Sequence, residues 1–198
     1  MIEKSYSISN IISLIWYLIY TKIRYRNARL IRTPFYSRGN KYIHFGKNLT
    51  TGVGCRIECM HIVGKKSPIL EFGRNVQLND YVHICALDRI EIGDDVLVAS
   101  HVYISDNSHG SYKGDNSDTS PNIPPIQREY YTASVKIGNR VWIGEGVMIL
   151  PGVTIGEGAI IGAHSIVNKD IPNNTIAVGS PAKPIKHFNF PTGHWEKL

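Results

Sequence analysis

One histidine stands where the sequence offers the best setting for chemistry. His109 lies in the segment Ser-Asp-Asn-Ser-His-Gly at 105–110, directly after an aliphatic run and directly before a long polar stretch. Small polar neighbours should leave its imidazole accessible, and an accessible imidazole can accept and return a proton near neutral pH. We therefore interpret His109 as a candidate general base, although a lone histidine is more often structural.

The polar stretch from 108 to 134 is rich in Gly, Asn, Asp, Ser and Pro. Loops of this length in compact proteins are usually functional or mobile. The stretch supplies Tyr112, Arg128 and Tyr130, whose side chains can stack on a sugar and hydrogen-bond to it. We predict a lid on the acceptor side of an active site, and a flexible insertion without a role is the alternative.

A six-residue repeat must position these groups. Residues 135–170 read VKIGNR, VWIGEG, VMILPG, VTIGEG, AIIGAH and SIVNKD, with an aliphatic third column throughout. Strand side chains alternate between faces and six is even, so the first and third columns of every unit point the same way. A fixed short period of this kind indicates a β-helix, in which three units close a coil of eighteen residues around an aliphatic axis.

Less regular copies of the repeat precede the polar stretch. Blocks of about eighteen residues recur near 45–62, 72–89, 90–107, 135–152 and 153–170, and two extra residues precede Ile92. We predict an all-β chain with five coils. The repeat domain spans 34–187, the excursion loop 108–134, and a C-terminal tail 188–198.

Composition limits the classes of function. The 198 residues carry a net charge of +6, and 42% of them are hydrophobic, which is enough for a core. The basic residues crowd between Lys22 and Arg32 without a zinc-finger or helix-turn-helix pattern, so we do not expect nucleic-acid binding. Cys55, Cys59 and Cys85 form no paired framework, which indicates a reducing compartment and a space-filling role near the solenoid wall.

Residues 1–33 differ from the rest of the chain. The apolar run at 8–20 is too short to span a bilayer, and no small-residue cleavage site follows it. Ser9 or Asn10 can cap a helix that is apolar almost all round. Two interpretations stay open. We favour a cap on the open end of the solenoid, which solenoids require, over an interfacial anchor whose basic residues meet anionic lipid.

The hexads, the segment from Asn79 to His109 and the ending SIVNKDIPNNTIAVGSPAKPIKHF together resemble the hexapeptide-repeat acetyltransferases. The resemblance covers most of residues 40–187. Through SDNSHGSY it is nearest to the O-acetyltransferases of bacterial lipopolysaccharide and capsule synthesis. It implies a left-handed parallel β-helix, a homotrimer, and acetyl-CoA held in a groove between subunits, with no metal.

The resemblance also implies roles for residues. His109 matches the family's catalytic histidine and Asn79 its active-site asparagine. The contacts to acetyl-CoA would fall on Gly144, Glu145, Ala163, Asn168, Lys169, Lys183 and Lys186. Asn168 stands where threonine is common, and His164 stands where glycine is usual. Trp142 lies in an outward column, so we expect its indole to meet a neighbouring subunit or, with Tyr112, Arg128 and Tyr130, the acceptor.

These roles predict direct transfer. His109 would take the proton of a sugar hydroxyl while that oxygen attacks the thioester, and Asn79 or a backbone amide would stabilise the oxyanion. No Ser or Cys nucleophile with an adjacent base is evident, which favours a ternary complex. We predict an acetyl-CoA-dependent O-acetyltransferase of a bacterial surface polysaccharide or its precursor. It would be cytoplasmic, and at the inner membrane face where the acceptor is lipid-linked.

Other functions stay open from the sequence. One is O- or N-acetylation of a small soluble sugar or amino sugar. A second is a zinc β-helix of the γ-type carbonic anhydrase kind, although His83 and His101 should fall in different columns because of the two-residue insertion. A third is a non-catalytic scaffold, which would not bind acetyl-CoA.

Overall fold

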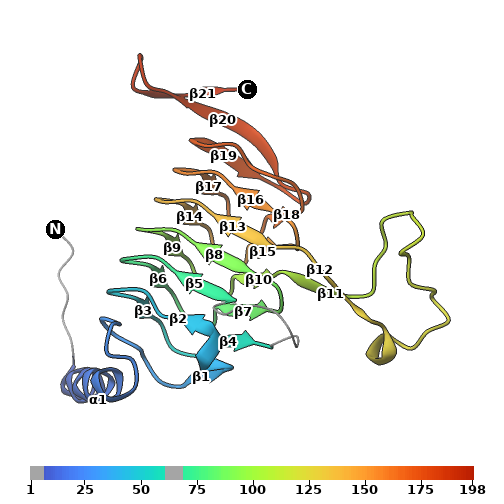
Figure 1. Ribbon diagram of the computed structural model, residues 1–198. Coiled ribbons are helices and arrows are strands. Elements are labelled where there is room, and N and C mark those ends of the chain that lie inside the picture. The colour runs from blue at the N-terminus through green and yellow to red at the C-terminus, as the bar shows by residue number, and fades with distance from the viewer. Residues whose placement is uncertain (1–6, 61–68) are drawn as a thin grey trace.

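The chain forms a parallel β-helix, as the hexads predict, and the helix is left-handed, as the family resemblance implies (Figure 1). The structure is a computed structural model that describes residues 7–60 and 69–198. Three sheets make the faces of a triangular prism. Sheet A holds β3 (Thr50–Thr51), β6 (Gln77–Leu78), β9 (Leu97–Val98), β14 (Trp142–Ile143), β17 (Ile160–Ile161), β19 (Thr175–Val178), β20 (Lys183–Asn189) and β21 (His194–Lys197).

The other two faces are sheets B and C. Sheet B holds β1 (Phe35–Arg38), β4 (Cys55–Cys59), β7 (His83–Ala86), β10 (Tyr103–Ser105), β15 (Met148–Ile149) and β18 (Ile166–Val167). Sheet C holds β2 (Ile43–His44), β5 (Leu70–Phe72), β8 (Ile90–Ile92), β13 (Val135–Ile137) and β16 (Thr154–Ile155). Two short 3₁₀ turns lie at Asn40–Tyr42 and Pro125–Gln127.

The five predicted coils are confirmed, because each runs once through sheets C, A and B in that order. Strand pairs β8–β13, β9–β14 and β10–β15 are direct neighbours. The excursion therefore leaves the stack and returns to it without interrupting it. Within the excursion, β11 (Asn107–His109) and β12 (Tyr130–Thr132) pair as an antiparallel hairpin that projects from the prism (Figure 1).

The aliphatic columns form the core along the axis. Ile104, Ile143, Ile149, Ile155 and Ile161 are all 0% exposed. Burying one such side chain stabilises the fold by about 1.5–3 kcal/mol relative to leaving it in water. Repetition of that term from coil to coil offsets the conformational entropy that the ordered strands lose.

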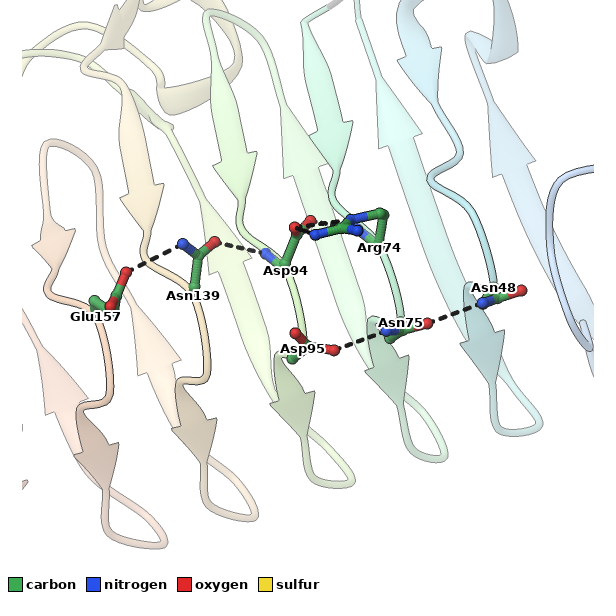
Figure 2. Close-up of polar contacts among 7 residues, drawn as sticks. All are labelled: Asn48, Arg74, Asn75, Asp94, Asp95, Asn139 and Glu157. Atoms are coloured by element: carbon green, nitrogen blue, oxygen red, sulfur yellow. Dashed lines mark hydrogen bonds and ion pairs between the residues drawn. The ribbon is translucent and has the colours of Figure 1, made fainter.

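The corners of the prism need backbone of left-handed conformation. At the corner between sheets C and A, Asn48, Asn75 and Asp95 have φ angles of 64°, 57° and 59°. Asn and Asp tolerate this region better than other residues with a Cβ atom. Their side chains also form a ladder, since Asn48 Nδ2 donates to Asn75 Oδ1 at 2.9 Å and Asn75 Nδ2 to Asp95 Oδ1 at 2.8 Å (Figure 2).

A second polar row runs along the same corner. Arg74 Nη2 lies 2.7 Å from Asp94 Oδ2, and the backbone N–H of Asp94 donates to Asn139 Oδ1 at 2.8 Å (Figure 2). Asn139 Nδ2 in turn donates to Glu157 Oε2 at 3.1 Å. These bonds hold the turns of successive coils in register.

Helix α1 (Ile8–Arg24) precedes the prism and lies beside its N-terminal coils (Figure 1). Ser7, rather than Ser9 or Asn10, caps it, because the Ser7 hydroxyl accepts from the Asn10 N–H at 3.3 Å. Within the described part of the chain, no helix combines the length and the apolar character needed to cross a membrane.

The cysteines fill space, as expected. Cys55 and Cys59 are buried on β4, and Cys85 is half-buried on β7. Burial raises the pKa of the Cys55 thiol to about 11 and that of Cys59 to about 12. It also raises the pKa of Cys85.

These thiols should react poorly in the folded protein. At pH 8 the Cys55 and Cys59 thiolates are populated at roughly one part in a thousand or less, since each unit of pKa above the pH lowers the thiolate tenfold. We expect iodoacetamide to label both residues only after unfolding in urea, with labelling followed by peptide mass spectrometry. Rapid labelling of Cys55 or Cys59 without urea would contradict their place in the wall.

Candidate active site

A buried carboxylate fixes the root of the excursion. Asp106 is 0% exposed, and its oxygens accept the backbone N–H groups of Leu87 at 2.8 Å, Asp88 at 2.7 Å and Arg89 at 2.8 Å. The two residues inserted between the second and third coils lie in the turn that wraps this carboxylate. The Asp106 carbonyl accepts the N–H of Ala133 at 2.9 Å, which ties the returning strand to the departing one.

The hairpin then places His109 among the side chains predicted to meet an acceptor. His109 pairs with Tyr130 in the register of β11 and β12, and their ring centroids are 4.7 Å apart. The Tyr112 hydroxyl donates to the His109 carbonyl at 2.5 Å, and Arg128 Nη1 donates to the Tyr112 oxygen at 2.6 Å. His109, Tyr112 and Tyr130 are exposed, so the cluster faces solvent in the single chain.

The corner between sheets A and B collects a second group of predicted residues. Asn79 and Gly144 directly follow Leu78 and Ile143, which are aligned through Val98 in sheet A. Ala163 lies one coil beyond Gly144. A Cβ atom on Gly144 would come within 2.6 Å of the backbone nitrogen of Ala163, so the coils can stack this closely only with glycine.

His164 occupies a left-handed corner position with a φ angle of 57°. The His164 N–H donates to the Glu145 carbonyl at 2.7 Å. A Cβ atom on Gly146 would lie 2.5 Å from the imidazole of His164. The ring therefore covers the glycine turn of the preceding coil, beside Glu145 and Ala163.

The remaining residues predicted to contact acetyl-CoA lie elsewhere. Asn168 and Lys169 follow β18 at the corner between sheets B and C, the corner from which the excursion departs two coils earlier. Lys183 and Lys186 lie on β20, which runs antiparallel to β19. All four side chains are at least partly exposed.

Asn79 and His109 are not neighbours along one face of the chain. Asn79 lies where the chain enters β7, and His109 lies beyond the end of β10, the parallel strand next to β7. The two residues therefore lie at opposite ends of the strands of sheet B, Asn79 where the strands begin and His109 beyond where they end. Trp142, on the outer face of sheet A, lies on the Asn79 side and is 50% exposed. None of Asn79, His109 and Trp142 lines the hollow of about 790 Å³ over sheet C.

Sequence reasoning missed an ion cluster on the outer face of sheet B. Arg56 Nε lies 2.6 Å from Glu58 Oε2, and His83 Nε2 lies 3.3 Å from the same oxygen. The hydrogen bonds from Arg56 and then from His83 hold the pKa of Glu58 below its usual range, against the opposing effect of burial. Arg56 and Glu58 are two residues apart on β4, and only the parallel register of β4 with β7 brings His83 to them, which the sequence of one strand does not reveal.

His83 and His101 do not stack. The register partner of His83 is Tyr103, two residues past His101, and His101 sits at a corner with a φ angle of 59°. Among residues 7–60 and 69–198, no three His, Cys, Asp or Glu side chains are grouped as metal ligands.

Similarity to known proteins identifies the family. Residues 134–169 match the family "Bacterial transferase hexapeptide (six repeats)". The chain is 45% identical over 196 residues to WbbJ of Escherichia coli (strain K12), covering 99% of this chain and 97% of that protein, whose name assigns it to lipopolysaccharide biosynthesis as an O-acetyl transferase. The chain belongs to the hexapeptide-repeat acyltransferases.

Two further acyltransferases extend the comparison. The galactoside O-acetyltransferase of Escherichia coli (strain K12) is 38% identical over 126 residues, which is 64% of this chain and 58% of that protein. The crystal structure of AntD, an N-acyltransferase from Bacillus cereus in complex with an amino-sugar nucleotide and coenzyme A, superposes with a TM-score of 0.65. It covers 84% of each chain at 23% identity, which supports the fold alone.

Asp106, the buried residue at the root of the excursion, was overlooked by sequence reasoning. The signal was present in two parts, an aspartate at the exit of a coil and a two-residue insertion one coil earlier. Only the coil stacking brings the two parts together.

We predict that Asp106→Asn destabilises the fold and loosens the hairpin. An amide nitrogen would face backbone donors that the carboxylate now accepts, and unsatisfied buried groups cost about 1–3 kcal/mol each. Urea unfolding should show a loss of about 2–4 kcal/mol, and limited proteolysis within 110–129 should accelerate. Asp118→Asn is the matched control, because that carboxylate is exposed within the same loop and accepts only the Gly114 N–H among the bonds described. Equal behaviour of the two variants would refute the role of Asp106.

Proposed function

We propose that the chain is an acetyl-CoA-dependent O-acetyltransferase that modifies a sugar hydroxyl of a bacterial surface polysaccharide or its precursor. The observation that carries the proposal is the hairpin cluster, in which a solvent-facing histidine lies among two tyrosines and an arginine. The similarity to WbbJ over nearly the whole chain supports the same class of acceptor.

His109 acts as the general base. Its ring takes the proton of the acceptor hydroxyl, the oxygen attacks the thioester carbonyl, and the released thiolate of coenzyme A recovers a proton from the imidazolium. An amide donor stabilises the charge on the carbonyl oxygen, and Asn79 is the candidate for this role. Tyr112, Arg128 and Tyr130 hold the sugar by stacking and hydrogen bonding.

Acetyl-CoA lies along the prism edges. At the glycine corner, Glu145 and Ala163 are exposed beside the buried Gly144, and the small side chains let the donor approach the chain closely. Lys169, Lys183 and Lys186 offer cations for the phosphates, and Asn168 offers an amide next to them. The names of WbbJ and of the galactoside O-acetyltransferase, both acetyltransferases, support an acetyl donor.

The complete site needs a second copy of the chain, in a homotrimer. Asn79 lies at the corner between sheets A and B, Trp142 lies on the outer face of sheet A, and His109 lies beyond the other end of the strands of sheet B. A neighbour that packs its sheet A against sheet B would bring these groups together. The surfaces support such packing. Leu97 and Trp142 on sheet A and Met148 on sheet B are exposed, whereas sheet C presents Glu71, Glu91 and Lys136 along its outer face.

We place the enzyme in the cytoplasm because its donor acetyl-CoA is made there, and at the inner membrane face when the acceptor is lipid-linked. In that case residues 1–33 would contact the membrane.

Replacement of His109 tests the base. We expect His109→Ala to lose about 10²–10⁴-fold in turnover while coenzyme A affinity is unchanged, because only proton transfer is removed. Release of free thiol should be measured with oligosaccharide hydroxyl acceptors and, in parallel, with amino-sugar acceptors. Near-normal turnover of the variant would exclude His109 as the base, and turnover on amino sugars alone would replace O-acetylation by N-acetylation.

Replacement of Trp142 tests the assembly. We expect Trp142→Glu to reduce the trimer to smaller species, because a carboxylate would be buried without a partner at the subunit contact. Light scattering after size-exclusion chromatography gives the mass directly. Lys136→Glu on sheet C should leave the mass at three times that of the chain. A trimer that persists in Trp142→Glu would show that sheet A is not the contact surface.

A further inference from the structure

Helix α1 presents its polar side to the protein. Thr21 is its one buried residue in the structure; its hydroxyl donates to the Tyr17 carbonyl at 2.6 Å and accepts the Ile31 N–H at 2.8 Å. Ser13, Leu14, Tyr17 and Tyr20 share this side and are half-buried. The helix is thus attached to the prism mainly through hydroxyl groups and rings, with Leu14 as the one aliphatic residue on this side.

The aliphatic side of α1 points away from the protein. At 100° per residue its members fall within an arc of about 160°. They are between 41% and 79% exposed: Ile8, Ile11, Ile12, Ile15, Trp16, Leu18, Ile19 and Ile23. A contiguous apolar face of this kind marks an interaction surface.

The solenoid does not use this face to close its open end. The N-terminal end of the core is filled by the segment after the helix, where Tyr25, Ala28 and Ile31 are buried in the main cluster. The Tyr25 ring packs 5.5 Å from Phe35 and 4.9 Å from Phe45. The apolar face of α1 is therefore left over after capping is complete.

A basic hollow of about 750 Å³ adjoins the same face. Leu18 of the apolar face lines it together with Lys22, Arg26, Arg29, Lys47 and Arg74. Its one acidic lining residue, Asp94, is already paired with Arg74 (Figure 2). Within residues 7–60 and 69–198, no carboxylate forms an ion pair with Lys22, Arg26, Arg29 or Lys47.

We propose that α1 and this basic hollow form a docking surface for an anionic lipid bilayer. The helix lies in the plane of the interface with its aliphatic side in the acyl boundary, and the hollow receives lipid phosphates. Trp16 suits the headgroup level, and Lys22, within the apolar face, can extend its ammonium to the phosphates. This surface lies outside the acetyl-transfer site and does not depend on the identity of the acceptor.

Charge decides between a bilayer and a second copy of the chain. A symmetric contact between two α1 faces would bring the cations of both copies together without carboxylates to balance them. Anionic headgroups supply the missing charge, at about 1 kcal/mol for each Lys or Arg near the surface.

Flotation of the full-length protein with vesicles tests the proposal. We expect the protein to float with phosphatidylcholine vesicles that contain phosphatidylglycerol, and to float much less with phosphatidylcholine alone or at high salt. Ile12→Glu/Ile19→Glu should lower flotation at least about tenfold, since charged groups are expensive in the acyl region. Asn10→Glu is the matched control on the opposite side of the helix and should float like the parent.

A charge series completes the test. Lys22→Glu/Arg26→Glu/Arg29→Glu should abolish flotation, whereas the same charge change at exposed positions elsewhere, Arg38→Glu/Lys136→Glu/Lys197→Glu, should leave most of it. Failure of the parent protein to float, or equal flotation of the apolar-face variant and its control, would overturn the proposal. So would a loss of oligomer mass in Ile12→Glu/Ile19→Glu without a loss of flotation, because a second copy would then cover the face.

Discussion

Stacking of aliphatic side chains along one axis is the constraint on which the remaining structure depends. Each coil buries the same columns against the coil before it, so no coil can shift by a residue without turning its aliphatic residues outward. The corners are consequently held in register as well, and residues one coil apart lie directly beside one another. That alignment places Asn79, Gly144 and Ala163 along one edge, although they are far apart in the chain. It also permits the amide and carboxylate ladder at the corner between sheets C and A.

An interior filled mainly by aliphatic side chains, with few hydroxyl groups such as that of Thr51, leaves little room for chemistry inside the solenoid. Charged groups lie at corners, on outer faces and in the excursion. Asp106 is the informative exception, since its carboxylate is fully buried where the excursion departs. It is tolerated because backbone N–H groups from the inserted turn satisfy it. The insertion in one coil and the loop in the next are therefore one structural unit, and this unit orients the strand that carries His109.

The repeat made most of the fold predictable, and long-range contacts limited the rest. Every unit from 135 to 170 repeats the same alternation, so the coils and the excursion follow from local pattern. The order of sheets followed from closing eighteen residues into a triangle. The bonds from Leu87, Asp88 and Arg89 to Asp106 could not be predicted, because they join the inserted turn to a residue one coil away.

The orientation of α1 could not be predicted from the sequence either. Leu14 and two tyrosines lie opposite the aliphatic face, so the pattern does not choose a side, and the bond of Thr21 with Ile31 shows which side faces the prism. The residue roles at the candidate site stay predictions, since composition and register position a side chain without assigning its chemistry.

The geometry of the coils relates the position of α1 to that of the hairpin with His109. Parallel strands in a sheet are about 4.8 Å apart, and the excursion leaves after β10, two strands beyond β4 and three beyond β1 in sheet B. Measured along the axis, the hairpin therefore departs roughly 10–15 Å from the coils beside α1. That separation is the length of two or three sugar units. With α1 at the lipid surface and the prism axis normal to the bilayer, a sugar at that height above the surface would reach His109. An enzyme bound in this orientation would select acceptors by distance from the bilayer as well as by the side chains of the hairpin.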